Sequence, residues 1–244
     1  MANHYKGAEV RYFEHGLGDY LDTEKQFQDG EYFHCVFAEG LEAYYQKNGK
    51  AFAAIRSAVE KECFLAPDLL LDQYFPQIND IKIEGDKPIV LLASQATEQF
   101  KVDSKAFWEH FLGLCLQQIE EPRNYTFLVK PHPRQDGQVL YDICAFLREK
   151  GLEVVLWEQP ELRSFHMEIL FRGMYERVKY VFSPFSSTVF YLSQLYPTAA
   201  IEYYYSLQSI FPYSQNTPEI YLNRWKDLYE LVQGALSKQA IEME

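Results

Sequence analysis

The stretch YTFLVKPHPRQDGQVLYDICAFLREKGLEVVLW, residues 125–157, decides the fold. Its first apolar run, at 125–130, is short and ends abruptly, which predicts a buried strand. Residues 138–149 then place apolar side chains at helical spacing, and Gly151 stands where that helix would end. A second apolar run at 152–157 completes a strand–helix–strand unit, which joins two parallel strands.

The same alternation extends on both sides of this unit. Further strands are predicted at 88–94, 179–183 and 199–204, and further helices at 104–119, 166–177, 186–195 and 218–236. Continuous apolar strands separated by helices are typical of an α/β fold with a parallel sheet covered on both faces. We therefore expect one doubly wound, Rossmann-type nucleotide-binding domain, whose ligand binds at the carboxyl ends of the strands.

A Gly-Asp-Lys-Pro turn near residue 85 marks the clearest domain boundary. It divides the chain into an N-terminal segment, 1–85, and a Rossmann-like domain, 86–244. The segment favours a strand at 9–16 and largely helical structure at 38–62. Because these are too few strands for a second sheet domain, we expect a partial N-terminal domain.

Composition and charge restrict the class of protein. The 244 residues are 48% hydrophobic, which supports a packed core, and the net charge of −12 argues against a nucleic-acid-binding protein but leaves a nucleotide ligand open. No signal peptide and no membrane-spanning run is recognised, so we expect a cytoplasmic protein. The four cysteines form no CxxC pair, so neither a zinc site nor a redox motif is predicted.

The loop after the strand at 125–130 carries the first candidate site. Pro131 and Pro133 prevent the strand from continuing and restrict the backbone of His132 between them. Lys130 and Arg134 favour an anion nearby, and a histidine can donate a proton to a departing phosphate. An ordinary turn with an incidental histidine is the alternative.

A second candidate site follows the strand at 179–183. Ser186, Ser187 and Thr188 open the next helix, where small hydroxyl residues cap free amides. The same amides and hydroxyls can bind a phosphate. Since this segment and the histidine loop follow different strands of one sheet, we expect both at the same edge.

Two acidic positions complete the set. Glu14 precedes His15 and a glycine, and its carboxylate is either a general base or part of a solvated loop. Glu168 interrupts an apolar segment, and a carboxylate in such surroundings needs partners. Ribose hydroxyls would suit Glu168; a favourable position at a helix N-terminus is the other interpretation.

Together, the four stretches resemble motifs of the bacterial sialyltransferases of the GT-B fold, including the capsular polysialyltransferases. The segment YFEHG resembles an acidic-acidic-glycine motif, KPHP an HP motif, HMEIL a glutamate motif, and SPFSSTVFYL a serine motif. They occur in the order seen in that family, from about residue 9 to 195.

This resemblance implies an inverting, metal-independent glycosyltransferase that moves sialic acid from CMP-sialic acid to a glycan hydroxyl in surface polysaccharide synthesis. It implies that Glu14 is the general base, that a protonated His132 assists the departure of CMP, and that no cofactor is needed. The implied CMP-binding residues are Lys130, Pro133, Glu168, Ser186, Ser187 and Thr188.

Two departures from the family pattern leave alternatives open. The acidic motif has His15 where the family prefers a carboxylate, so the base is either Glu14 or His15. The short segment 1–85 suggests a partial acceptor-side domain, which leaves an inactive CMP-binding domain as one alternative. A CDP-glycerol glycerophosphotransferase and a Kdo transferase are the others, and peripheral association with the inner face of the membrane also stays open.

Overall fold

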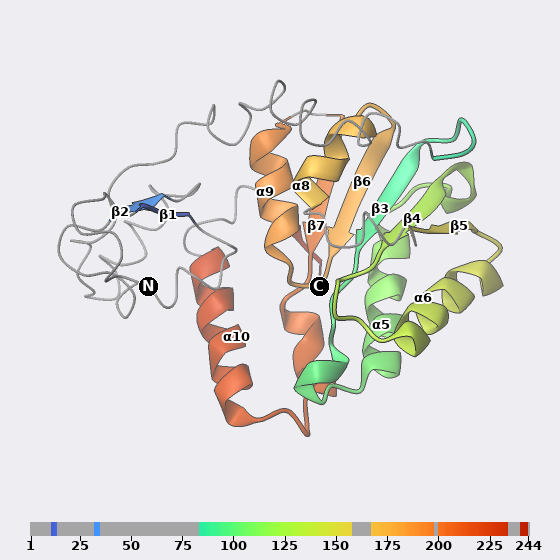
Figure 1. Cartoon of the computed structure of the whole chain (residues 1–244). Helices are drawn as coiled ribbons and strands as arrows, with labels where there is room; N and C mark the ends of the chain where they lie inside the picture. Colours follow the sequence, from blue (N-terminus) through green and yellow to red (C-terminus); the bar gives the residue numbers. More distant parts are fainter. Residues whose placement is uncertain are drawn as a thin grey trace.

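A computed structural model describes residues 11–13, 32–34, 83–157, 167–197, 200–233 and 240–243; for residues 11–13, 32–34, 168 and 169 it describes the backbone alone. The main body is a six-stranded, fully parallel sheet with helices on both faces (Figure 1). The expectation of a doubly wound α/β domain is therefore confirmed.

The elements follow one another in strict alternation along most of the domain. The strands are β3 (Ile89–Ala93), β4 (Thr126–Lys130), β5 (Glu153–Leu156), β6 (Val178–Ser183), β7 (Glu202–Tyr205) and β8 (Ile241–Glu242). The α-helices are α5 (Ser104–Gln117), α6 (Gly137–Glu149), α8 (Met167–Leu170), α9 (Ser187–Leu195) and α10 (Glu219–Leu231). Short 3-10 helices lie at Glu98–Phe100, Pro122–Asn124, Phe171–Gly173 and Gln208–Tyr213. None of the helices in the described ranges is long and apolar enough to cross a membrane.

The strand order places the topological switch point at the centre of the sheet. The order is β5-β4-β3-β6-β7-β8, so the chain first winds from β3 toward β5 and then returns to the other side of β3. In chain order this is 3-2-1-4-5-6, the arrangement of dinucleotide-binding domains. The direction of winding changes between β3 and β6, and ligands of such sheets bind beyond the carboxyl ends of the strands at that point.

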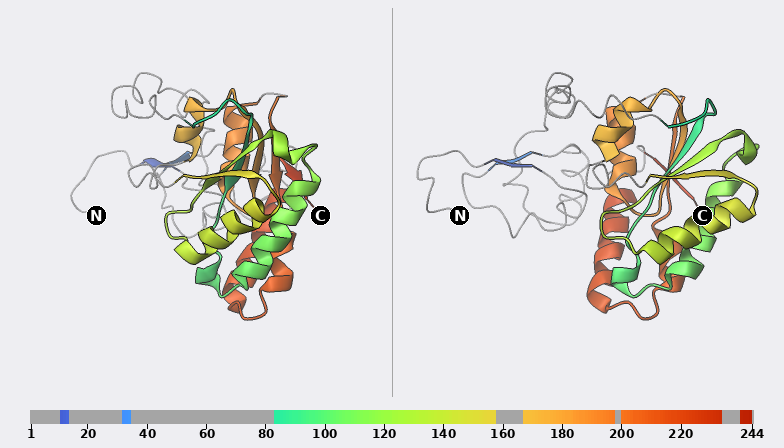
Figure 2. Two further views of the ribbon diagram at one scale, coloured as in Figure 1. Left: turned by 90° about the vertical axis from the view of Figure 1, so that its right-hand side faces the viewer. Right: turned by 45° about the vertical axis from the view of Figure 1, so that its right-hand side comes forward.

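Alternate residues of each strand enter two separate cores because side chains of a strand point to opposite faces. On one face, Leu91, Leu128 and Val181 pack with side chains of α8 and α9. On the other face, Leu92 and Phe182 pack with side chains of α5 and α6. The turned views show α5 and α6 lying side by side along this second face (Figure 2). The strands β3 and β4 are thus buried on both faces, which explains their apolar runs, whereas the edge strand β5 is more exposed.

Local signals fix the ends of the helix within the opening stretch. Asp136 caps α6, because its Oδ1 accepts a hydrogen bond of 2.7 Å from the backbone N–H of Gln138. At the other end, Gly151 has a φ of +76° and ends the helix in the left-handed conformation that glycine adopts most readily. The strand–helix–strand unit predicted from the sequence is confirmed at both ends.

Two expectations differ from the structure. The helix predicted at 166–177 is shorter: α8 ends at Leu170, and a 3-10 turn ends at Gly173. Glycine disfavours helix, and residues 174–177 must turn the chain back toward the buried start of β6. The two-residue strand β8 was not predicted, because so short a segment carries no hydrophobic period. It is held to β7 by a 2.8 Å bond from the N–H of Met243 to the carbonyl of Tyr205.

The N-terminal part contributes a small parallel pair, β1 (Arg11–Phe13) with β2 (Tyr32–His34). The strand predicted at 9–16 is confirmed for the residues of β1. The helical structure predicted at 38–62 lies outside the described residues, and the division at residue 85 stays a prediction.

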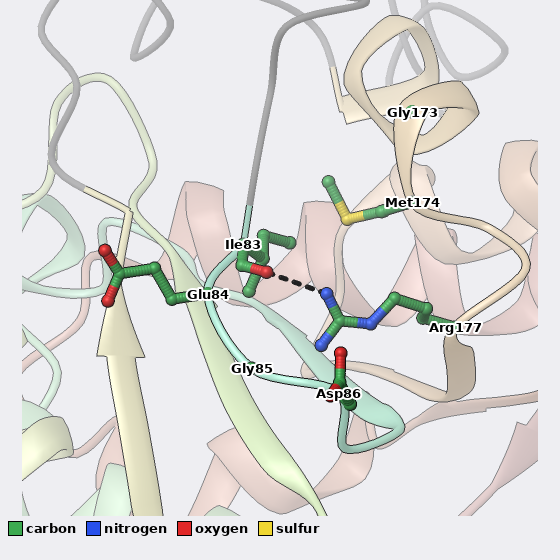
Figure 3. A pocket seen from close by; sticks show the side chains of 7 residues that line it. All are labelled: Ile83, Glu84, Gly85, Asp86, Gly173, Met174 and Arg177. Atoms are coloured by element: carbon green, nitrogen blue, oxygen red, sulfur yellow. Dashed lines mark hydrogen bonds between the residues drawn. The ribbon is translucent and has the colours of Figure 1, made fainter.

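Arg177 fastens the segment that leads into β3. Its guanidinium donates one hydrogen bond of 2.8 Å to the carbonyl of Ile83 (Figure 3). It donates another of 2.9 Å to the carbonyl of Lys87. Because Arg177 immediately precedes β6, this clamp ties the starts of two neighbouring strands together at the amino edge of the sheet. A pocket opens beside it, between residues 83–86 and 173–177.

Arg177→Met should therefore destabilise the domain. Methionine keeps most of the side-chain length but donates no hydrogen bond, so we expect the free energy of unfolding to fall by about 1–3 kcal/mol, the range for bonds to a charged donor. Urea denaturation measures this change. Arg148→Met, at an exposed position on α6, is the matched control and should change stability little. Equal losses of stability in the two variants would contradict a stabilising role for the hydrogen bonds of Arg177.

Candidate functional site

The two loops singled out from the sequence lie at one edge of the sheet, as expected. Strand β3 pairs with β4 on one side, with Ala93 opposite Lys130, and with β6 on the other, with Leu92 opposite Phe182. The loops after β4 and β6 are therefore two strand spacings apart, about 10 Å. The end of β3 lies between them, so three loops meet at the switch point of the sheet.

Ser94, the first residue after β3, was not anticipated as part of this site. Its side chain is buried, its N–H donates to the carbonyl of Lys130 at 3.0 Å, and its Oγ lies 2.9 Å from the same oxygen. Its Oγ also accepts from the N–H of His132 at 3.2 Å. Ser94 thus joins the ends of β3 and β4. The signal in the sequence was a small polar residue directly after the apolar run of a central strand.

His132 is half-buried, and its ring is held by the loop itself. The backbone N–H of Arg134 donates to Nδ1 at 3.2 Å. Burial, together with the positive charges of Lys130 and Arg134, lowers the pKa of His132 below its ordinary value of 6.5. This direction favours the neutral imidazole in the absence of a phosphate. A protonated His132 that assists the departure of CMP stays a prediction. A neutral ring with Nδ1 as acceptor carries its proton on Nε2, and this N–H can donate to a phosphate oxygen.

The neighbours of His132 take different positions. Lys130 is only 7% exposed, and its Nζ donates to the carbonyl of Pro131 at 3.1 Å. Pro133 and Arg134 are exposed at the surface of the loop. The site therefore has one buried and one exposed cation, and both favour a nearby anion.

The serine segment after β6 begins a helix, as predicted. Ser186 is the N-cap of α9, and its Oγ accepts from the N–H of Thr188 at 3.2 Å. The N–H of Ser186 in turn donates to Oγ of Ser183 at 3.3 Å. Capping, the simpler of the two interpretations, is thus present, with Ser187 and Thr188 half-buried in the first turn. The positive end of the helix dipole lies here and favours a phosphate.

An aromatic anchor, which the sequence did not reveal, fixes this segment. The ring of Phe185 lies 5.9 Å from that of Trp225 on α10 and 6.4 Å from that of Phe107 on α5, measured between centroids. Such tilted ring pairs add to the energy of burial. The loop after β6 is thereby held against two helices distant in the sequence.

The acidic candidates are less fully described. Glu14 and His15 lie outside the described residues, so the identity of the base stays a prediction. Glu168 lies in α8, where only its backbone is described. Its neighbours Met167 and Leu170 are buried in the core that α8 shares with α9. A contact of Glu168 with ribose likewise stays a prediction.

The lowered pKa of His132 gives a test of this geometry. The pKa of His132 is lower in the folded protein than in the unfolded chain, where it is about 6.5. Between these two values the unfolded chain binds more protons than the folded protein. The free energy of unfolding therefore decreases as the pH falls from 6.5 through the pKa of His132 in the folded protein. An NMR titration of the ring should give a midpoint below 6.5, and a bound phosphate should raise it by favouring the cation. A midpoint at or above 6.5 without ligand would contradict the described surroundings of the ring.

Comparisons with known proteins bear on what this site does. Comparison with curated proteins gives no match. Among solved structures, the wall teichoic acid polymerase TagF is similar, with a TM-score of 0.37 and 11% identity over 84% of this chain and 53% of that one. The chain thus spans about half the length of the polymerase chain, and so weak a likeness carries no argument about function.

The family comparison is more extensive. The family model described as alpha-2,8-polysialyltransferase matches residues 1–205 of the 244. The match includes β3 to β7, the loop of His132 and the serine segment at the start of α9. Since it covers most of the sequence, the chain belongs to the alpha-2,8-polysialyltransferase family, a family of glycosyltransferases.

Proposed function

We propose that the chain transfers sialic acid from CMP-sialic acid to a hydroxyl of a glycan acceptor, with inversion and without a metal ion, in the synthesis of a surface polysaccharide. Two phosphate-suited groups carry this proposal: His132 after β4 and the amino end of α9 after β6, on either side of β3. Membership of the family supports the choice of donor. A position at the inner face of the membrane stays part of the expectation.

The proposed step needs one group that takes the proton of the acceptor hydroxyl and another that stabilises the departing phosphate. The bond between the anomeric carbon and the phosphate oxygen breaks, and its electron pair leaves with CMP. The acceptor oxygen forms the new glycosidic bond, and its proton passes to a base, either Glu14 or His15. His132 stabilises the departing phosphate by donating from Nε2, while Lys130 and the first turn of α9 offset its charge. These groups can balance the charge of a phosphate without a metal ion.

We extend the proposal to the other residues that would contact CMP-sialic acid. Ser187 and Thr188 are half-buried in the first turn of α9 and offer hydroxyls and amides to the phosphate. Pro133 borders His132 on the exposed side of the loop. We assign Glu168 to the ribose hydroxyls, because a carboxylate accepts two such hydrogen bonds at once.

Nucleotide selectivity tests the donor. Calorimetry should show that CMP binds and that UMP binds more weakly. His132→Ala should weaken CMP binding roughly tenfold or more, the loss of a hydrogen bond to a charged group. His110→Ala is the matched control, since His110 is exposed on α5.

Other outcomes separate the alternatives. Equal affinity for CMP and UMP, or none for either, would refute the donor proposal. Preferential binding of CDP-glycerol would instead favour a glycerophosphotransferase. Transfer from CMP-Kdo but not from CMP-sialic acid would identify a Kdo transferase.

Removal of the base should separate turnover from binding. Glu14→Gln should reduce transfer roughly 100-fold or more, as expected when a general base is lost, yet leave CMP affinity nearly unchanged. The assay is run with and without EDTA, and abolition of the wild-type rate by EDTA would contradict metal independence. If His15→Ala loses the rate while Glu14→Gln keeps it, His15 is the base, and the donor site is unaffected by that result.

A further inference from the structure

The loop 131–136 between β4 and α6 has few backbone donors, and nearly all of them bond to side chains. Pro131 and Pro133 have no N–H. The N–H of Arg134 donates to Nδ1 of His132, and the N–H of Asp136 donates to Oε1 of Glu98 at 2.6 Å. The loop is thus organised by side-chain acceptors rather than by regular secondary structure, so those acceptors decide its conformation.

Gln135 is the central acceptor of the loop. Its side chain is only 4% exposed, and Oε1 lies within hydrogen-bond distance of Oγ of Ser94 and 3.3 Å from the N–H of His132. Because the Ser94 hydroxyl has one proton, it donates either to this oxygen or to the carbonyl of Lys130. The N–H of Gln135 also donates to the carbonyl of His132 at 3.0 Å. The turn around His132 is therefore closed from two sides by one buried residue, and Ser94 links that residue to the end of β3.

We propose that Gln135 and Ser94 are positioning residues for His132. They hold the turn in which the N–H of Arg134 bonds Nδ1, so the neutral ring keeps its proton on Nε2 and directs that proton away from the loop. In the opposite tautomer, Nδ1–H would face the N–H of Arg134, and two donors would oppose each other. The tautomer is thus a consequence of the loop, and its use toward a nucleotide phosphate rests on the proposed function.

The burial of both residues makes the arrangement rigid. Ser94 and Gln135 are each at most 4% exposed, so water does not readily replace the bonds between them. Loss of either acceptor leaves the N–H of His132 with one partner instead of two. We therefore expect that removing the side-chain oxygen of either Gln135 or Ser94 makes the ring of His132 more mobile. Neither substitution removes a group that is proposed to touch the nucleotide.

The test compares two pairs of variants in the full chain. Gln135→Met removes the acceptor at similar size, and Gln135→Glu retains an acceptor oxygen; Ser94→Ala removes the hydroxyl, and Ser94→Thr retains it. Nitrogen-15 NMR of the histidine rings, with His132→Ala to assign the signal, shows which nitrogen carries the proton. We expect the Nε2–H form in the wild type and in Ser94→Thr, and a mixture of tautomers in Gln135→Met and Ser94→Ala.

Nucleotide binding gives a second readout. CMP affinity should fall roughly tenfold in Gln135→Met, as for loss of one well-made hydrogen bond to a charged group, and recover in large part in Gln135→Glu. Gln138→Met is the matched control, because Gln138 is exposed at the start of α6 and should change neither readout.

The two proposals fail in different ways. A wild-type ring protonated on Nδ1, or an unchanged tautomer in both Gln135→Met and Ser94→Ala, would overturn the positioning role. If the tautomer shifts as expected while the wild type binds no CMP, the positioning role stands and the donor proposal fails. If Gln135→Met does not fold, the Ser94 pair still decides the question by the same NMR measurement.

Discussion

The arrangement of this domain depends on β3 pairing in parallel with two strands that are far apart in the sequence. Its partners are β4 and β6, which begin near residues 126 and 178. Because of this central position, the chain winds outward twice in opposite directions, and the direction changes between β3 and β6. This position also brings the loop of His132 and the start of α9 to the same edge, although about fifty residues separate them. Without this pairing, the two loops would not lie together at one edge of the sheet.

Much of the fold could be predicted because both faces of the sheet are buried. Strands that are apolar on both sides give continuous apolar runs, and the helices between them show one-sided periodicity. Gly151 marked the end of α6 in the sequence, whereas the cap at its start, Asp136, was found in the structure. The helix predicted at 166–177 was wrong beyond Leu170. The apolar pattern continues there, but the chain must turn back to enter β6, and this tertiary constraint outweighs the local preference for helix.

The candidate site was predictable in part, and the limit is set by distance along the chain. His132 between two prolines and the hydroxyl residues at the start of α9 are recognisable from residue type and local spacing. Ser94 and Gln135 are not, because their roles depend on contacts about forty residues apart. Phe185 is recognisable as apolar, but its anchoring by Trp225 joins segments that no periodicity connects. Sequence patterns therefore indicated the groups proposed to bind the nucleotide more readily than the residues that hold those groups in place.

The different burial of Lys130 and Arg134 has a consequence for the ionic strength of the solution. Mobile ions screen exposed charges over about 8 Å at physiological salt, but they screen a buried charge much less. The field of Arg134, at the surface of the loop, should therefore weaken as salt is added, whereas that of Lys130 persists. In a protein with a net charge of −12, salt also reduces the long-range repulsion of an anionic nucleotide. If the proposed nucleotide binds here, added salt should ease its approach to the protein and weaken its attraction to Arg134, while its attraction to Lys130 should change little.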